Sequence, residues 1–127
     1  MAYKCGTSLV LMLSDLHFGK DTAGGYTIEQ AAKRVESLPE KLKGHPWLFD
    51  FDEIRVLLGG DIVEGEGIYP SQSAELKQPA LQHYQVADAA LWRMVSGLRI
   101  RWPSCAVTVD SVPGNHGRQS PTAHPST

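Results

Sequence analysis

The chain has 127 residues, of which 42% are hydrophobic and 20% are charged, and its formal net charge is −2. This length suits one domain, and this composition predicts a folded core. The charge excludes a broad basic surface for nucleic acid, although bound divalent cations would reverse the local field at a site. No apolar run approaches the roughly 18 residues of a bilayer span, and no signal peptide is evident, so we expect a cytoplasmic protein without membrane contact.

The first predicted strand and helix lie in the N-terminal part of the chain. Residues 9–13 form a short apolar, β-rich run that predicts a strand, and the polar turn SDLHFG follows it directly. Apolar residues recur at helical spacing over residues 27–38, and Thr27 with Gln30 is a capping-box candidate, so we expect a helix there. Pro39 is expected to end or kink this helix.

Two further strands enclose a second helix. Residues 54–58 and 106–112 are β-rich, and they precede the turns GGDIVEGEG and PGNHG. Between them, a stripe of apolar residues at helical spacing predicts a helix that is entered through Pro79. The members of this stripe, which we expect to face the core, are Leu81, Tyr84, Ala87, Leu91, Met94 or Val95, and Leu98.

The order strand, helix, strand, helix, strand predicts an α/β fold with a parallel βαβαβ sheet and right-handed crossovers. Open sheets of this kind bind ligands at the carboxyl ends of their strands. All three polar turns follow the carboxyl end of a predicted strand. We therefore expect their side chains to form a single site from segments that are far apart in the sequence.

Asp15 and His17 follow the first strand and offer a carboxylate oxygen and an imidazole nitrogen. In an extended segment, residues two apart point to the same side, so the pair can bind one cation. This mixed ligand set suits Mn, Fe or Zn better than Mg, which prefers oxygen ligands. A strand-end cap beside a surface histidine has the same D-x-H pattern, so the pair alone does not define a site.

Asp61 follows Gly59 and Gly60 after the second strand. Its two carboxylate oxygens can bridge two cations about 3.5–4 Å apart. After the third strand, Asn115 offers a neutral amide oxygen, and His116 offers a proton or a hydrogen bond. Each turn alone is compatible with ordinary turn chemistry, but the three together, each directly after a strand, predict a two-metal site.

The other acidic and histidine residues give weaker signals. We interpret Glu64 and Glu66 as solvated loop charges, either of which could hold a metal-bound water. His45 precedes a proline, His83 lies in the second predicted helix, and His124 lies in the polar C-terminal stretch. We expect none of these three histidines to bind metal.

The motifs D-x-H, G-D and G-N-H resemble the opening motifs of the calcineurin-like metallophosphoesterase superfamily, and the runs GGDIVEGEGIYPSQ and PGNHGR are most similar to phage-encoded members. The resemblance covers roughly residues 8 to 118. It implies that residues 1–118 form the N-terminal half of a four-layer α/β/β/α sandwich. Residues 119–127 are expected to be a polar, disordered end.

The resemblance also implies a role for each matched residue. Asp15 and His17 would bind the first of two divalent metal ions, Asp61 would bridge both ions, and Asn115 would bind the second. His116 would be catalytic, acting on the phosphate or the leaving group. Mn is the expected metal, with Fe and Zn as alternatives. The implied reaction is hydrolysis of a phosphate ester, in particular a phosphodiester, by activated water, with DNA and RNA among the candidate substrates.

The sequence departs from the family pattern in two respects. Gly117 stands where an acidic residue normally follows G-N-H, so the role of His116 has less support than the metal roles. The family's second sheet, with its G-H-x-H motif, is not found in these 127 residues. We therefore expect an exposed apolar sheet face, which self-association or a second polypeptide would cover. A non-catalytic module that binds a partner protein, or a fragment of a longer gene product, is the alternative interpretation.

Overall fold

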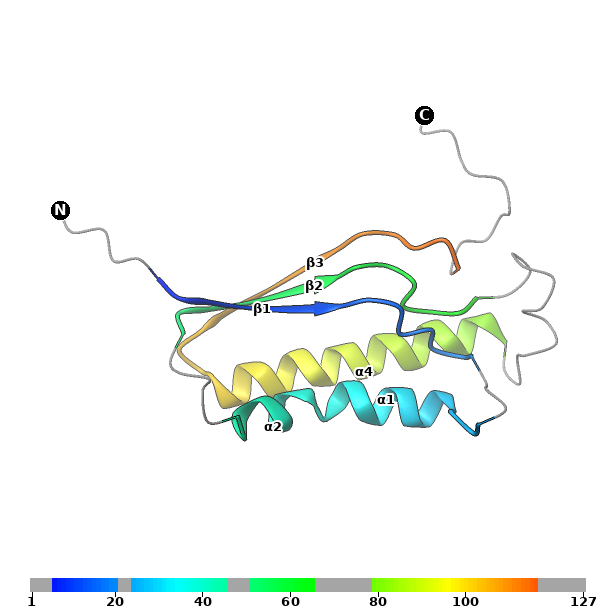
Figure 1. Ribbon diagram of the computed structural model, residues 1–127, viewed down its shortest axis with the longest axis horizontal. Coiled ribbons are helices and arrows are strands. Elements are labelled where there is room, and N and C mark those ends of the chain that lie inside the picture. Colours follow the sequence, from blue (N-terminus) through cyan, green and yellow to red (C-terminus); the bar gives the residue numbers. More distant parts are fainter. Residues whose placement is uncertain (1–5, 21–23, 46–50, 66–78, 117–127) are drawn as a thin grey trace, which may run out of the picture.

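A computed structural model describes residues 6–20, 24–45, 51–65 and 79–116, and it contains a parallel three-stranded sheet with helices against it (Figure 1). The strands are β1 (Ser8–Leu13), β2 (Glu53–Leu58) and β3 (Ala106–Ser111), hydrogen-bonded in the order β1-β2-β3. The predicted strands and the parallel α/β arrangement are therefore confirmed. The stretch 119–127, which was expected to be a disordered end, lies outside the described residues.

Helix α1 (Ile28–Glu36) begins at the predicted capping box. The backbone N–H of Gln30 donates to the Thr27 hydroxyl, and the Gln30 side chain accepts from the Thr27 N–H, which satisfies two N-terminal donors. The helix ends before Pro39, as expected, because a proline in the helix interior would remove a hydrogen bond. Pro39 then lies in the first turn of a short helix, α2 (Leu38–Lys43), where its missing N–H has no cost.

Helix α4 (Ala80–Arg101) spans 22 residues and buries a stripe that differs in part from the predicted one. Its fully or nearly fully buried residues are His83, Ala87, Ala90, Met94 and Leu98. Leu81 and Tyr84 were predicted to face the core, and this prediction was wrong, because they are 66% and 39% exposed. Two successive steps of three toward the N-terminus rotate these residues away from the buried face, and His83, four residues before Ala87, takes the inward place. Within the described residues, no helix has the length and apolar character of a bilayer span.

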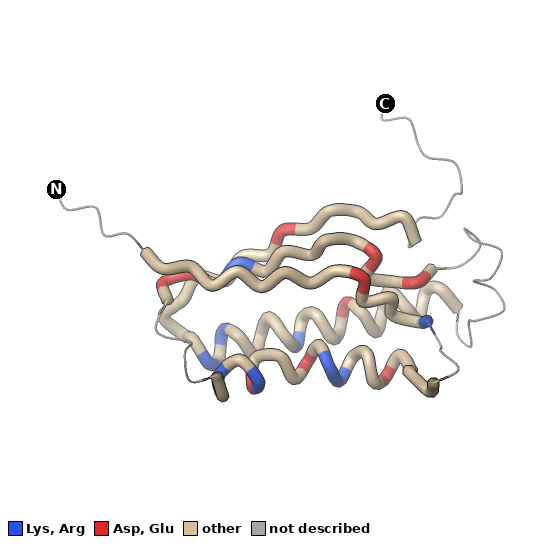
Figure 2. The backbone as a smooth tube through the Cα atoms, viewed as in Figure 1, with Lys and Arg blue, Asp and Glu red and all other residues tan. Residues whose placement is uncertain are grey.

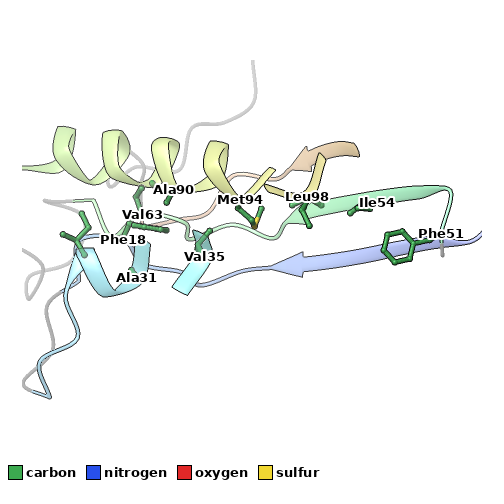
Figure 3. Packing of buried hydrophobic residues seen from close by; sticks show 12 residues of the cluster. Phe18, Ala31, Val35, Phe51, Ile54, Val63, Ala90, Met94 and Leu98 are labelled. Atoms are coloured by element: carbon green, nitrogen blue, oxygen red, sulfur yellow. The ribbon is translucent and has the colours of Figure 1, made fainter. Parts of the chain in front are cut away.

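The three helices of the described part of the chain lie on one face of the sheet, so this part has two layers (Figure 1). The core between the layers contains Ile54 and Val56 of β2 and Met94 and Leu98 of α4, all of them fully buried (Figure 3). Ion pairs also hold the helices to one another. Arg93 in α4 donates to Glu36 at 2.8 Å, and Arg101 pairs with Glu40 of α2.

The opposite face of the sheet has no helix against it in the described part of the chain (Figure 1). Val10 and Met12 on this face are 53% and 72% exposed. Their register partners in β2 are Arg55 and Leu57, and Leu57 in turn pairs with Asp110 of β3. An exposed apolar face was expected, and the open face does expose Val10 and Met12, although Arg55 and Asp110 interrupt its apolar area.

Two methionines test whether this face is open in solution. Met94→Ala should lower the free energy of unfolding by about 2–5 kcal/mol, because it leaves a cavity in the core. The matched control Met12→Ala should change it by less than about 0.5 kcal/mol, because Met12 is mostly exposed. Urea denaturation of the purified protein measures both values. A loss at Met12 as large as that at Met94 would show that another surface covers the open face.

Candidate metal centre

The loops after β1 and β2 run side by side and are joined by backbone hydrogen bonds. The N–H of Asp15 donates to the carbonyl of Gly60 at 3.1 Å, and the N–H of His17 donates to the carbonyl of Asp61 at 3.0 Å. The N–H of Phe18 continues this pairing to the carbonyl of Ile62 at 2.8 Å. The two loops therefore form one backbone unit, which sets the relative positions of their side chains.

Three residues in these loops have a left-handed backbone. The φ angles are +54° at Asp15, +45° at His17 and +48° at Asp61, a region that residues with a side chain rarely adopt. Such residues cost of order 1–3 kcal/mol each and cluster at functional sites. Asp15 and His17 were predicted to be extended, and this prediction is wrong. Their side chains still come together, with Oδ1 of Asp15 3.9 Å from Nε2 of His17.

Asp61 connects the loop after β2 to the loop after β3. Its Oδ1 accepts from the backbone N–H groups of Asn115 and His116, at 2.8 and 2.9 Å. Gly114 is required for this approach, because a Cβ at that position would overlap the backbone nitrogen and Oδ1 of Asp61.

Several effects set the charge state of Asp61. Burial acts to raise the pKa of Asp61, but the bonds from the His116 and Asn115 N–H groups and the nearby His116 and His17 imidazoles outweigh it, so the pKa is lowered. The carboxylate is consequently ionised at neutral pH and able to bind a cation.

His17, Asp61 and His116 form a group that could hold a metal ion. Each offers one ligand atom, and these atoms lie within 4.8 Å of one another. The two imidazole rings meet edge to face, with their centroids 4.6 Å apart. Imidazole nitrogen with carboxylate oxygen is a donor set that suits a transition metal or zinc. His116, which was assigned a catalytic role from the resemblance, thus lies with the candidate ligands.

Glu64 is the residue of this site that the sequence analysis misinterpreted. Its side chain is 2% exposed, so it is not a solvated loop charge. Its carboxylate contacts Nδ1 of His17 at 2.6 Å and Nδ1 of His116 at 3.3 Å. Both contacts are made through Nδ1, so in each ring Nε2 is the nitrogen that does not face Glu64. A carboxylate behind a metal-binding histidine orients the ring in this way in many metal sites.

Asp15 and Asn115 lie at the exposed margin of the group. The side chain of Asp15 is 69% exposed, and Asp15 is not among the clustered ligand atoms found in the described residues. Asn115 is exposed, and its backbone N–H donates to Oδ1 of Asp61. Acidic residues gather at the carboxyl ends of the strands (Figure 2). The structure therefore brings all five predicted residues to one edge of the sheet, with ligand atoms of three of them within 4.8 Å of one another.

His83 is fully buried beneath the loop that carries His17. A Cβ on Gly19 would overlap the His83 ring, and Gly19 has a φ of +101°, so only glycine suits this position. His83 is not part of the ligand group found among the described residues.

Neither a scan against protein-family models nor a search of curated proteins finds a match to this chain. The resemblance to metallophosphoesterases accordingly depends on the three motifs.

Glu64→Gln tests whether this carboxylate orients the two imidazoles for a metal. The amide keeps the size of the side chain but loses the charge, so Mn²⁺ affinity should fall by about 10–100-fold. Glu53→Gln, at the opposite end of β2, is the matched control and should bind Mn²⁺ as the wild type does. Isothermal titration calorimetry measures both affinities. Equal affinity in Glu64→Gln and wild type would contradict the role of Glu64.

Proposed function

We propose that this chain is a metal-dependent phosphoesterase that hydrolyses a phosphodiester, and that its fold is the first half of a calcineurin-like metallophosphoesterase sandwich. The observation that carries the proposal is that His17, Asp61 and His116 come together from three separate strand ends. The buried Glu64 contacts both of these histidines. A scaffold has no physical need for three left-handed residues and a buried carboxylate at one edge of its sheet.

The donor atoms fit divalent cations, with Mn as the first choice and Fe or Zn as alternatives. When bound, such cations polarise phosphoryl oxygens and activate water. Asp15 and His17 are proposed as ligands of one ion, Asp61 as the shared ligand, and Asn115 as a ligand of the other. The Asp61 carboxylate is held in place for this role by the two backbone N–H groups that donate to its Oδ1.

His116 is proposed to act on the phosphate or the leaving group. Its Nδ1 faces Glu64, so its Nε2 is the atom that can donate a hydrogen bond or a proton when the ring is charged. Glu64 supports this role, because its carboxylate lies 3.3 Å from Nδ1 of His116 and orients the ring. It supplies the acidic partner that the sequence lacks at Gly117.

A second candidate function is that of a partner-binding module without activity. The observation in its favour is the open sheet face with the exposed Val10 and Met12. A parallel sheet is normally covered on both faces. In the proposed four-layer fold, a second sheet would cover this open face. Self-association or another polypeptide would supply that sheet.

Thermal unfolding with and without Mn²⁺ tests the metal site. A ligand that binds only the native state stabilises it by about 2.7 kcal/mol at a concentration of 100 Kd, so Mn²⁺ should raise the Tm of the wild type. Asp61→Asn should lose most of this increase, because it removes the charge of the shared ligand. Asp110→Asn, on β3 at the open face, should keep the increase. The increase is compared within each variant, so a change in metal-free stability does not affect the result.

The same three proteins are then assayed with Mn²⁺ and bis(4-nitrophenyl) phosphate. Hydrolysis by the wild type and by Asp110→Asn, but not by Asp61→Asn, is the outcome expected of a phosphoesterase. An increase in Tm without any hydrolysis would favour the partner-binding module. No increase in Tm at millimolar Mn²⁺ would refute the metal site itself.

A further inference from the structure

A pocket of about 420 Å³ opens beside the candidate metal centre, between the loop after β1 and helix α1. Asp15 and His17 line its inner side, and Lys20, Tyr26 and Arg34 are among the residues that line the rest. The backbone N–H of Lys20 donates to the carbonyl of His17 at 3.0 Å, so a tight turn joins this pocket to the metal centre. A ligand bound at His17 therefore lies within reach of the pocket.

Two cationic side chains distinguish this pocket from its acidic surroundings. Lys20 and Arg34 line it, whereas acidic residues gather at the nearby strand ends (Figure 2). Arg55, Arg93 and Arg101 each pair with a glutamate. Among the described residues, neither Lys20 nor Arg34 belongs to any such ion pair. Their charges are therefore available to an anionic group that enters the pocket.

The Arg34 side chain is held in place by an aromatic ring. Its guanidinium carbon lies over the ring of Tyr26, 4.8 Å from the centroid, which is a cation–π contact. This contact restricts a long side chain that would otherwise lose much rotamer freedom on binding a ligand. A guanidinium has five N–H donors in a planar fork, so it suits the oxygens of a phosphate.

We propose that this pocket binds a second, non-scissile phosphate of the substrate, and that the substrate is a single-stranded nucleic acid. The proposal rests on the proposed function, in which the metal centre takes the scissile phosphate. A phosphate ester with one phosphate has no group to place between Lys20 and Arg34. A nucleic-acid strand always carries a neighbouring phosphate, and the Tyr26 ring adds an aromatic surface near the flanking nucleotide. Because the chain has a net charge of −2, these local cations are needed to attract a strand.

Binding without metal tests the pocket independently of catalysis. A fluorescent single-stranded dT12 is titrated with protein in EDTA over a range of salt concentrations, and anisotropy gives the Kd. Arg34→Gln and Lys20→Gln should each weaken binding about tenfold and reduce the slope of log K against log salt by about 0.7. Lys33→Gln is the matched control, because Lys33 is exposed on the same helix and does not line the pocket. An effect of Lys33→Gln equal to that of Arg34→Gln, or no effect of Arg34→Gln, would overturn the proposal.

A competition experiment distinguishes a nucleic-acid strand from a small polyphosphate as the ligand of the pocket. Unlabelled dinucleotide with two phosphates should displace dT12 at lower concentration than pyrophosphate does. More effective displacement by pyrophosphate would overturn the assignment to a strand and favour a small polyphosphate.

Hydrolysis in Mn²⁺ completes the test. Arg34→Gln should lower kcat/KM for a single-stranded oligonucleotide about tenfold and leave kcat/KM for bis(4-nitrophenyl) phosphate as in the wild type, because the aryl ester has no second phosphate. Equal losses on both substrates would overturn the proposal. If neither substrate is hydrolysed, the phosphoesterase function fails, while the anisotropy result still decides whether the pocket binds phosphate.

Discussion

The parallel, in-register pairing of three strands is the constraint on which the candidate site depends. Leu13 of β1 lies beside Leu58 of β2, and Leu58 lies beside Ser111 of β3, so all three strands end at the same level. The loops that follow must then share one edge of the sheet. Residues as far apart in the chain as His17 and His116 come into ring contact for this reason.

The edge of the sheet is held in an unfavourable local conformation by contacts between loops. Left-handed backbone at Asp15, His17 and Asp61 and the burial of the Glu64 carboxylate each oppose folding. Two sets of hydrogen bonds offset these unfavourable contributions to folding. One set joins the backbones of the loops after β1 and β2, and the other joins Asp61 to the loop after β3. The proposed metal site is thus preorganised by the protein, so a cation would meet ligands that are already oriented.

In the described part of the chain, helices cover only one face of the sheet. The other face is the one that the proposed second sheet would cover. The helices bury Ile54 and Val56 against Met94, while Met12 stays exposed on the other face. The charged partners of that face, Arg55 and Asp110, reduce its apolar area. A partially polar face is compatible with a two-layer chain in water and also with a wet interface to a second sheet.

The sequence by itself determined the elements and their order, because these depend on local chemistry. Strand runs, helical spacing, the capping box of Thr27 and Gln30, and the position of the polar turns after each strand are all properties of neighbouring residues. From them followed the parallel sheet and the meeting of Asp15, His17, Asp61, Asn115 and His116 at one edge.

Only the tertiary structure decided the roles of Glu64 and His83 and the exposure of Leu81. Glu64 lies in a glycine-bearing turn that looks solvated, yet it is buried because His17 and His116, 47 and 52 residues away, close over it. His83 faces inward, and Leu81 outward, because Gly19 of the loop after β1 leaves room for an imidazole ring. Burial and ring orientation arise from contacts between distant segments, which hydrophobic spacing within one segment does not encode.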